Sequence, residues 1–397
     1  MSRLLVTANS PGEMAGWVRP ILNEWHHREL GPVDILLLPC SFATGQEERV
    51  ARTLPGVDRV YRPSEYLRLW SKDGRDYRDG NLLHLGGDLM YSAFLSWRWK
   101  IRSWSYLWAR PWWNSAFTGF FTKDDWGVNW LKKRRVESEK IHLSGDLVLD
   151  SVRQHVPRPT LEKKNQISYL PGSRSHEVAA LAPFFLELHR RLQDVQPGLQ
   201  GYLHVSPFLP EEQLRGLLES SPDPKVGGLA GRVQGHALGN GDTRIQIVTT
   251  QHYQRLSESK LAVSIPGTKT AEAGYLRTPV LTLVPTNRPE HLPSIGLAGL
   301  LDFLPGGAQL KGRLLLRLKP TVGHLAHPNI LAGRALLPEL IENVRPEPLA
   351  RLVNTLLADT KNLRSVSEVL RELYPWTAAA AAMMVETIGC PETSRRR

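Results

Sequence analysis

Residues 167 to 178 read Ile167-Ser-Tyr-Leu-Pro-Gly172-Ser173-Arg174-Ser-His-Glu177-Val178, an apolar run that enters a Pro-Gly turn and an arginine. Apolar residues then recur at helical spacing, at Val178, Leu181, Phe184, Phe185, Leu188 and Leu192. The pattern predicts a strand that turns into the N-terminus of a helix. Because a helix start offers unpaired N–H groups and a guanidinium can hold two oxygens, we expect phosphate or diphosphate to bind here. An ordinary loop with Arg174 in a surface ion pair is the alternative.

The residues that follow continue the alternation of strands and helices, with strands expected at 202–205, 245–249, 261–265 and 279–284. The third of these strands enters a second glycine turn, Pro266-Gly267-Thr268-Lys269-Thr270-Ala-Glu272. Two phosphate-compatible turns in one domain, with Glu272 placed for ribose hydroxyls, favour a nucleoside diphosphate. Thr268 and Lys269 fit a helix cap and a solvated charge equally well. The ATP-binding pattern G-x-x-x-x-G-K-[ST] does not occur, so ATP hydrolysis is not expected.

The N-terminal half predicts a βαβ unit and therefore a parallel sheet. Strands are expected at 4–8 and 33–38, with a helix from Trp17 to about Arg28 between them. Ligands bind at the C-terminal ends of such strands, where Glu13 can orient a substrate hydroxyl or simply face the helix dipole. Gly12 and Gly16 do not form a G-x-G-x-x-G fingerprint, so no dinucleotide site is predicted.

A second acidic residue follows another predicted strand, where the run 82–85 ends in Gly86-Gly87-Asp88. Paired glycines allow a backbone or a ligand to approach closely, and an aspartate there can act as the general base for a hydroxyl nucleophile. A turn-forming aspartate is an equally good interpretation. The pair His26-His27 is interpreted as two exposed helix residues, not as metal ligands.

The length of 397 residues exceeds one compact core of usual size and predicts two domains. The polar, proline-bearing segment 154–165 is the expected linker. We expect an N-terminal domain over 1–160, a second domain over 161–345, and C-terminal helices with a basic tail over 346–397. With 41% hydrophobic and 22% charged residues, the chain is typical of globular proteins. Neither a membrane-spanning run nor a signal-peptide pattern is found, so a cytoplasmic location is expected.

The chain is basic, with 50 Lys and Arg against 39 Asp and Glu and a formal charge of +11. This balance predicts attraction to polyanions, anionic lipid surfaces or phosphorylated substrates. Eight of the twelve tryptophans lie between Trp97 and Trp130, interleaved with Lys and Arg. Tryptophan prefers the water–lipid boundary, so we expect peripheral membrane contact through Trp104, Trp108, Trp112 and Trp113. A structural core or an oligomer interface is the alternative.

Several motifs resemble those of the bacterial lipid-A-disaccharide synthases, inverting glycosyltransferases of the GT-B fold. They are Leu170-Pro-Gly-Ser-Arg174 with Glu177-Val178, Gly267-Thr-Lys-Thr-Ala-Glu272, His327-Pro-Asn329-Ile-Leu-Ala-Gly-Arg334 followed by Leu337 to Leu340, and Gly145-Asp146 with Asp150. The resemblance implies an α/β protein with two Rossmann-like domains whose parallel sheets face a central cleft, followed by C-terminal helices. The N-terminal match is weaker, because Ala15 and Trp17 replace the serine and aspartate of a Gly-Glu-x-Ser-Gly-Asp loop, and Leu89-Met-Tyr91 replaces a second acidic motif.

The resemblance further implies transfer of an acylated glucosamine from UDP-2,3-diacylglucosamine to lipid X, with inversion and a β-1,6 linkage. It implies donor contacts by Gly172, Ser173, Arg174, Gly267, Thr268, Glu272 and Asn329. Asp88 is the first candidate for the base and Glu13 the second. No metal or other cofactor is expected, since neither an Asp-x-Asp pair nor a His/Cys cluster occurs. The expected partners are a UDP-sugar, a lipid acceptor and the inner face of the cytoplasmic membrane, without nucleic acid, and a homodimer is left open.

Alternative functions predict different behaviour. A related GT-B enzyme could act on another lipid acceptor, and a UDP-sugar 2-epimerase would act on a soluble sugar without any acceptor. A non-catalytic lipid-binding module would bind lipid or polyanions whether or not UDP is present. Strong salt dependence with DNA alone would also support a binding module.

Overall fold

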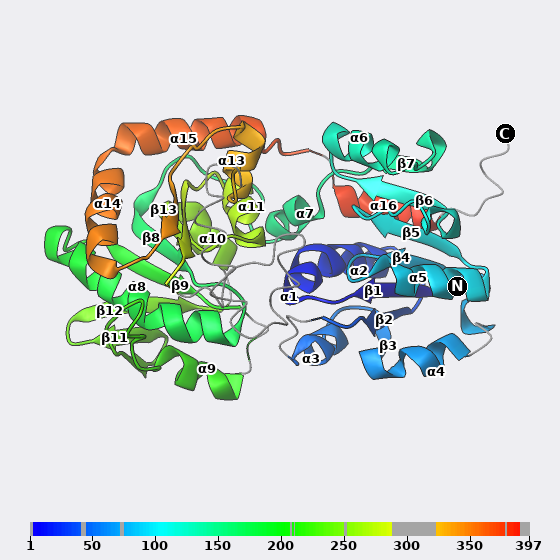
Figure 1. The fold of residues 1–397 in the computed structure, drawn as a ribbon, viewed down its shortest axis with the longest axis horizontal. Coiled ribbons are helices and arrows are strands. Elements are labelled where there is room, and N and C mark those ends of the chain that lie inside the picture. The colour runs from blue at the N-terminus through cyan, green and yellow to red at the C-terminus, as the bar shows by residue number, and fades with distance from the viewer. Residues whose placement is uncertain are drawn as a thin grey trace. The chain divides into compact units, whose positions relative to one another are not determined.

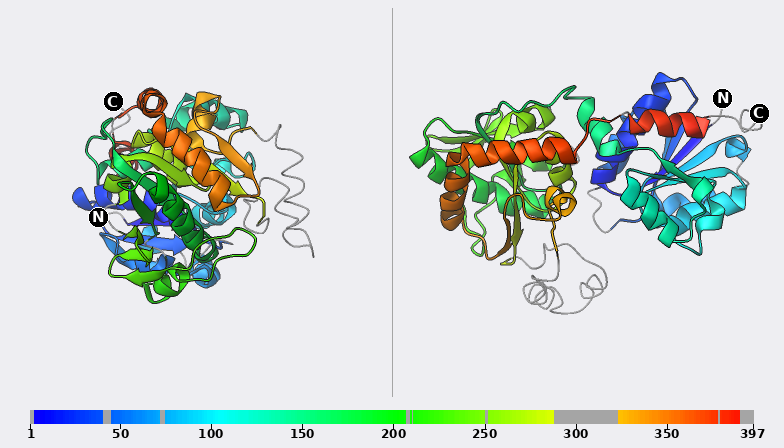
Figure 2. Two further views of the ribbon diagram at one scale, coloured as in Figure 1. Left: turned by 90° about the vertical axis from the view of Figure 1, so that its left-hand side faces the viewer. Right: turned by 90° about the horizontal axis from the view of Figure 1, so that it is seen from above.

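The computed structural model describes residues 3–40, 45–71, 75–206, 209, 211–249, 252–287, 323–377 and 379–389. The chain divides into two compact units (Figure 1). Unit 1 comprises Met1–Gln154 together with Trp376–Arg397, and unit 2 comprises His155–Pro375. Each unit is built on one sheet with helices on both of its faces (Figure 2).

Unit 1 contains a seven-stranded sheet in the order β3-β2-β1-β4-β5-β6-β7, with every neighbouring pair parallel. Its strands are β1 (Leu4–Ala8), β2 (Val33–Leu37), β3 (Val57–Tyr61), β4 (Asn81–His84), β5 (Arg102–Tyr106), β6 (Gly119–Thr122) and β7 (Ile141–Leu143). Its α-helices are α1 (Pro11–Glu13), α2 (Arg19–His27), α3 (Glu47–Arg52), α4 (Tyr66–Ser71), α5 (Leu89–Trp99), α6 (Asp125–Lys133), α7 (Leu147–Arg153) and α16 (Ala380–Gly389). A π-helix, η1 (Met14–Val18), joins α1 to α2, and 3₁₀ turns lie at η2 (Pro63–Glu65), η3 (Arg75–Tyr77), η4 (Asn114–Ala116) and η5 (Ser138–Lys140).

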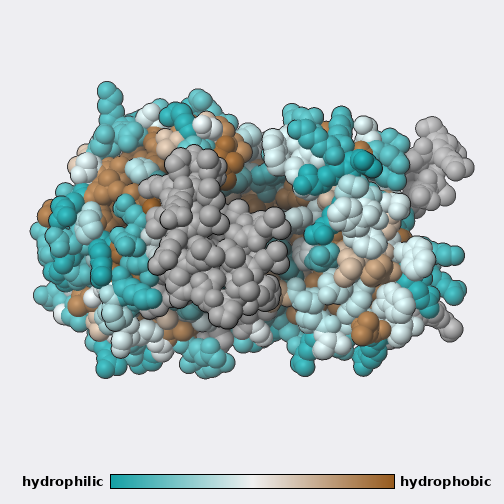
Figure 3. Space-filling view, viewed as in Figure 1, coloured by the Kyte–Doolittle hydropathy of each residue, from teal (hydrophilic) through white to brown (hydrophobic). Residues whose placement is uncertain are grey.

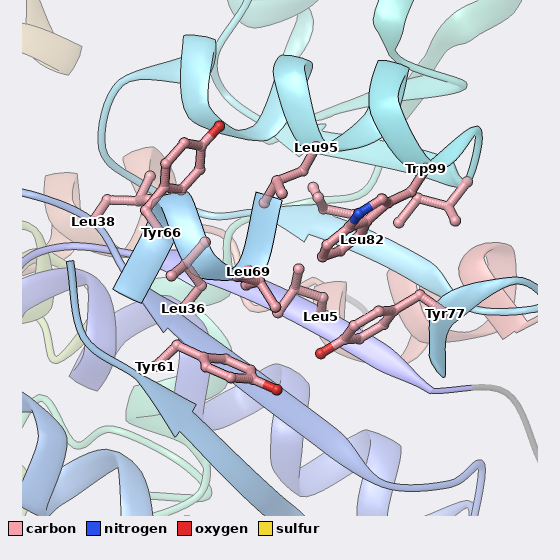
Figure 4. Close-up of a cluster of buried hydrophobic side chains, with 11 residues drawn as sticks. Leu5, Leu36, Leu38, Tyr61, Tyr66, Leu69, Tyr77, Leu82, Leu95 and Trp99 are labelled. Atoms are coloured by element: carbon pink, nitrogen blue, oxygen red, sulfur yellow. The ribbon is translucent and has the colours of Figure 1, made fainter. Parts of the chain in front are cut away.

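The central strands of unit 1 are apolar because helices cover both faces of the sheet. Every residue of β1 and β2 is buried. On one face, α4 and α5 enclose a core to which the sheet contributes Leu5, Leu36 and Leu82 and the helices contribute Leu69 and Leu95 (Figure 4). This core holds α5, and therefore the loop before it, against the end of β4.

Unit 2 contains an eight-stranded sheet in the order β10-β11-β12-β9-β8-β13-β14-β15. Its strands are β8 (Lys164–Leu170), β9 (Gln200–His204), β10 (Arg232–Gln234), β11 (Ala237–Asn240), β12 (Thr243–Val248), β13 (Ser259–Ser264), β14 (Val280–Pro285) and β15 (Glu339–Glu342). The pairs β10–β11 and β11–β12 are antiparallel and the others are parallel. Its helices are α8 (Ser175–Val195), α9 (Glu211–Leu218), α10 (His252–Glu258), α11 (Thr268–Tyr275), α13 (His327–Ala332), α14 (Pro346–Ala358) and α15 (Thr360–Leu373).

The C-terminal helices are shared between the units. Helices α14 and α15 pack within unit 2, on α8 and α11, whereas α16 packs within unit 1, on α2 and α7. Asp150 in α7 holds the start of α16, because its Oδ2 accepts the backbone N–H of Ala381 at 2.6 Å. Met384, Val385 and Ile388 on α16 are fully buried against unit 1.

The strands expected at 4–8, 33–38, 82–85, 167–170, 202–205, 245–249, 261–265 and 279–284 are all confirmed, with small shifts at their ends. The helix expected from Trp17 was wrong in its start, since helical structure begins at Pro11. Ser10 and Glu13 explain the earlier start: the Ser10 Oγ accepts the Glu13 N–H and the Glu13 carboxylate accepts the Ser10 N–H, which is a capping box. His26 and His27 are exposed, as expected. Across the described ranges, no helix combines the length and the apolar character that crossing a membrane requires.

Candidate active site

Each sheet has one point at which the order of its strands reverses. In unit 1, β1, β2 and β3 run outward in one direction and the chain then returns to place β4 on the other side of β1. In unit 2, β8 is followed by β9 on one side, and β13 later pairs with its other side. Loops at the C-terminal ends of the strands that flank such a switch point form ligand sites in α/β proteins. The β1 and β4 loops carry Glu13 and Asp88, and the β8 and β13 loops carry the two glycine turns.

Glu13 is the last residue of α1, the short helix that follows β1, and it is half-buried. Its Oε2 accepts the backbone N–H groups of Asn9, at 3.0 Å, and Ser10, at 3.2 Å. Burial raises the pKa of Glu13 to about 7, although these hydrogen bonds act in the opposite direction. A carboxyl group with a pKa near neutrality is suited to general base catalysis.

Gly86 provides the space that the Glu13 carboxyl group occupies. A Cβ atom on Gly86 would lie 1.8 Å from Oε2 of Glu13, so any side chain at this position would displace the carboxyl group. Glu13 therefore bridges the loops after β1 and β4, which flank the switch point of unit 1. The sequence marked Gly86 only as half of a glycine pair, and nothing in its spacing indicated contact with Glu13.

Asp88 has the surroundings of a helix cap. Its Oδ1 accepts the N–H of Met90 at 2.9 Å, which places Asp88 at the N-cap of α5. The side chain is 44% exposed, and the Arg110 guanidinium lies 3.7 Å from its Oδ2. This geometry gives Asp88 a structural role and less shielding from water than Glu13 has.

A buried polar group supports the switch point of unit 1 and was missed in the sequence. Thr7, His84 and Ser92 bond one another with separations of 2.8 to 3.0 Å, and all three are fully buried. They link β1, β4 and α5. Burial lowers the pKa of His84 to about 3, so the imidazole is neutral at physiological pH. The trio fixes the position of α5 beneath the two loops.

The first glycine turn of unit 2 is ordered by Glu177. Its Oε1 accepts a hydrogen bond from the Arg174 guanidinium at 3.0 Å, and its Oε2 accepts the Arg174 backbone N–H at 3.1 Å. Gly172 has φ +107°, and a Cβ atom there would lie 2.2 Å from Oε2 of Glu177. Ser173 is half-buried between these residues. The turn therefore presents Arg174 at the start of the 21-residue helix α8.

The second glycine turn lies beside the first, because β13 pairs with β8 with Ser264 opposite Leu170. Gly267 has φ +152° and precedes Thr268, the first residue of α11. Both residues are exposed. The Thr270 hydroxyl donates to the Gly267 carbonyl at 2.8 Å and accepts the N–H of His327 at 3.1 Å. The two turns therefore follow neighbouring strands, and their binding of an anion stays a prediction.

Glu272 is buried one turn into α11 and pairs with Lys269, whose Nζ lies 2.7 Å from its Oε2. The same ammonium lies 3.4 Å from Nε2 of His252, at the start of α10. These contacts set a charged pair beside the second glycine turn. The role of Glu272 in binding ribose stays a prediction.

The side chain of Asn329 bonds to other residues of the protein. It is 2% exposed, and its Nδ2 donates to the Leu337 carbonyl and to Glu339 at 3.0 and 2.8 Å. Its Oδ1 accepts the N–H of Leu336 at 2.8 Å. These bonds close the segment after α13. Asn329 therefore has a structural role in this segment, and its expected contact with the donor stays a prediction.

The tryptophans predicted to meet a membrane have different environments. Trp104 lies in β5, is 2% exposed, and donates its Nε1–H to Asn81, so its assignment to a membrane surface was wrong. A buried strand position faces the core whatever charges flank it. Trp113 is half-buried and packs edge-to-face on Phe94, with ring centroids 5.1 Å apart. Trp108 and Trp112 are 43% and 65% exposed.

Three further exposed apolar residues were not predicted from the sequence, namely Leu67 and Trp70 on α4 and Trp97 on α5. Together with Trp108 and Trp112, in the loop 107–113, we call these residues the α4–α5 surface. Leu67 and Trp97 are each 74% exposed. In Figure 3, pale and light-brown atoms lie over α5 and are bordered by teal ones.

Among the residues that the structure describes, no group of three or more His, Cys, Asp and Glu side chains is arranged to hold a metal ion.

Two Rossmann-like units, each with its functional loops at the switch point of a sheet of mainly parallel strands, define the GT-B fold, as predicted from the sequence. A UDP-GlcNAc 2-epimerase from Neisseria meningitidis, solved with UDP-GlcNAc bound, superimposes with a TM-score of 0.56 at 14% identity, over 98% of this chain and 99% of that one. A wall teichoic acid polymerase superimposes with a TM-score of 0.53 at 10% identity, over 98% and 88% of the two chains. These likenesses show the fold.

The sequence is similar to lipid-A-disaccharide synthases, which confirms the resemblance seen in the motifs. The synthase of Burkholderia vietnamiensis is 28% identical over 224 residues, or 55% of this chain and 47% of the relative. That of Syntrophus aciditrophicus is 24% identical over 233 residues, or 57% and 50% of the two chains. The chain thus spans about half the length of the curated relatives it matches. No protein-family model matches the chain.

Proposed function

We propose that this protein is a glycosyltransferase that transfers an acylated glucosamine from a UDP-sugar to a lipid acceptor, with inversion at the anomeric carbon. The proposal rests on one observation at the switch point of unit 2. The turns 172–174 and 267–268 follow two neighbouring strands, β8 and β13. Similarity to proteins named lipid-A-disaccharide synthase supports a lipid-linked glucosamine substrate, with UDP-2,3-diacylglucosamine as donor and lipid X as acceptor.

Unit 2 would hold the UDP moiety. The helix starts of α8 and α11 directly follow the two glycine turns, where helix N-termini favour anions, and the Arg174 guanidinium adds a full positive charge. Negative charge grows on the diphosphate as its bond to the sugar breaks. Donors already fixed in place stabilise that charge without reorganisation, which is an efficient form of catalysis. Glu272 would bind the ribose hydroxyls.

Unit 1 would activate the acceptor. Glu13 takes the proton from the acceptor hydroxyl as the hydroxyl oxygen attacks C1 of the donor sugar. The bond from C1 to the diphosphate oxygen breaks on the opposite face, and its electron pair leaves with UDP, so the configuration at C1 is inverted. The raised pKa and partial burial of Glu13 favour it over Asp88, which was the first candidate from the sequence.

The α4–α5 surface would bring the protein to its lipid substrates. Exposed tryptophans next to basic residues suit the boundary between lipid tails and anionic head groups. Arg98 and Arg110 lie within the same segments as Trp97 and Trp108. A peripheral location on the inner face of the cytoplasmic membrane follows from the proposed substrates and from this surface.

A transfer assay tests the proposal directly. Purified protein is incubated with UDP-2,3-diacylglucosamine and radiolabelled lipid X, and the lipid products are separated. We expect a labelled disaccharide that requires both substrates. Failure to transfer to any lipid acceptor, together with conversion of UDP-GlcNAc to its 2-epimer in the absence of acceptor, would show an epimerase instead. Lipid binding unaffected by UDP, without either reaction, would identify a binding module.

A further inference from the structure

The contacts of Glu177 place it behind the proposed diphosphate site. One carboxylate oxygen receives the backbone N–H of Arg174 and the other receives its guanidinium, at 3.1 and 3.0 Å. The Glu177 side chain is 8% exposed and that of Arg174 is 27% exposed, so the acid lies beneath the base. Glu177 thus determines both the backbone position and the side-chain direction of Arg174.

We infer that Glu177 is a positioning residue that holds Arg174 ready for the diphosphate; this inference rests on the proposed function. A guanidinium carries five N–H donors, and Arg174 donates one of them, from Nη1, to Oε1 of Glu177. An arginine already held in one orientation loses less side-chain entropy when it grips a ligand. Glu177 therefore favours UDP binding although its own charge is negative.

Gly172 supports this assignment because it makes room for the glutamate. A Cβ atom on Gly172 would lie 2.2 Å from Oε2 of Glu177 and 2.7 Å from Cδ1 of Ile265. The positive φ of Gly172 and the absence of a side chain allow the carboxylate to lie against the turn. The local sequence is thus shaped around the Glu177 carboxylate as well as around an incoming anion.

A purely structural role predicts a different response from a positioning role. If Glu177 only capped α8, its loss would loosen the turn and weaken every ligand of the site alike. If only its charge mattered, its neutralisation would strengthen the binding of any anion, since a repulsion would be removed. A positioning role predicts weaker diphosphate binding that depends on Arg174 being present.

The experiment is a double-variant cycle measured by NMR titration, which reaches millimolar affinities. Wild type, Glu177→Gln, Arg174→Ala and the double variant are titrated with UDP and with uridine, which lacks the diphosphate. We expect Glu177→Gln to weaken UDP binding about tenfold in the wild-type background. We expect a change of less than about twofold in the Arg174→Ala background, and uridine affinity within about twofold throughout.

Several outcomes would overturn the inference while leaving the donor assignment intact. One is an equal loss of affinity for UDP and uridine in Glu177→Gln. Another is an equal loss of UDP affinity with and without Arg174. The third is tighter UDP binding by Glu177→Gln. Should the glutamine variant not fold, Glu177→Asp keeps the charge on a shorter stem that cannot reach both nitrogens, and wild-type affinity in that variant would also overturn the inference. Absence of UDP binding by the wild type would instead refute the proposed function, and the positioning role with it.

Discussion

Glu13 combines a structural role with the properties of a base. Its carboxylate closes a capping box with Ser10 and receives the N–H of Asn9, which orders the loop after β1. The same burial raises its pKa to about 7. Burial does not help a glutamate that serves only as a helix cap. The carboxylate form accepts the capping hydrogen bonds, and water stabilises that form better than a buried site does.

Replacing Glu13 by glutamine should lower the transfer rate by at least about 100-fold, because glutamine cannot take up a proton. UDP affinity should not change. In the wild type, kcat/KM should rise with pH and level off above about 7, where Glu13 is ionised. Steady-state kinetics from pH 5 to pH 9 measure both effects. The matched control is Asp88→Asn, for which we expect only a modest loss of transfer rate. A larger loss in Asp88→Asn than in Glu13→Gln would make Asp88 the base.

The stability of the Glu13→Gln variant provides a separate prediction. The folded-state pKa of Glu13 is about 7 against a reference value of 4.5, so protonated Glu13 contributes stability that is present below about pH 4.5 and lost as the pH rises through about 7. Glutamine avoids this loss. We expect the variant to be more stable than the wild type by about 1 to 2 kcal/mol at pH 8, with little difference at pH 4.5. Urea unfolding at both pH values measures the difference, and a less stable variant at pH 8 would contradict the assignment.

Gly86→Ala should displace the Glu13 carboxyl group, since the added Cβ would lie 1.8 Å from Oε2. We expect a loss of transfer activity and about 1 to 3 kcal/mol of stability. Gly216→Ala in α9 is the matched control, because a Cβ there meets no atom within 4 Å and alanine favours a helix. Activity assays and urea unfolding compare the two variants. An active, stable Gly86→Ala protein would show that Glu13 does not need its observed position.

Site residues could be predicted from the sequence where the residue type and the flanking pattern together leave few possible roles. Arg174 and Gly172 follow an apolar run and precede a helical pattern, which fixed their position at a strand-to-helix turn. Trp104 was misassigned because flanking charges do not reveal that a strand residue points into the core. The contact between Gly86 and Glu13 depends on two loops that are distant in sequence, and no local pattern encodes it.

At the scale of elements, α16 depends on one buried carboxylate. Asp150 accepts the N–H of Ala381, and burial raises the pKa of Asp150 to about 6. The Arg153 guanidinium, one turn along α7, lies 5.4 Å from the ring centroid of Trp376 and contributes to the same attachment. The first turn of α16 thus receives its cap from a helix far away in the sequence.

Asp150→Ala should release the start of α16, because the backbone N–H of Ala381 would lose its partner in a buried setting. We expect about 1 to 2 kcal/mol lower stability and faster amide exchange in α16. Asp150→Asn keeps an acceptor and removes a buried charge. Because the folded-state pKa of Asp150 is raised, ionisation of its carboxyl group lowers the stability of the wild type as the pH rises from about 3.8 to about 6. Above pH 6, the asparagine variant should therefore be at least as stable as the wild type. Hydrogen exchange at pH 7.5 measures the stability of α16 in both variants. Unchanged exchange in Asp150→Ala would refute the capping role.

The strands were predictable because buried strands of parallel sheets are continuous apolar runs, as in residues 4–8 and 261–265. The antiparallel hairpin of β10 and β11 is short and polar, and it gave no such signal. The pattern of α16 is helical in the sequence, but a helical pattern does not show which unit its apolar face will meet. Burial of Met384, Val385 and Ile388 attaches α16 to unit 1, together with the bond from Ala381 to Asp150 across 231 residues.

At the scale of the whole molecule, the proposed membrane contact rests on the formal charge of +11 and on the α4–α5 surface. Replacing Trp97 and Trp112 by serine should reduce binding to vesicles that contain anionic lipid, by about tenfold or more. Trp126→Ser is the matched control, since Trp126 is 71% exposed on α6 and lies outside this surface. Co-sedimentation with liposomes measures the effect. Equal binding by all three proteins would assign the tryptophans another role.

The proposed function depends first on the donor site of unit 2, and calorimetric titration with UDP tests that site most directly. Wild type is compared with Arg174→Ala and with Arg190→Ala, a control that removes an arginine from the same helix away from the glycine turns. We predict saturable UDP binding by the wild type and by Arg190→Ala, and binding about 10 to 100 times weaker in Arg174→Ala. No UDP binding by the wild type at low salt, or equal affinity in Arg174→Ala, would contradict the assignment of the donor site.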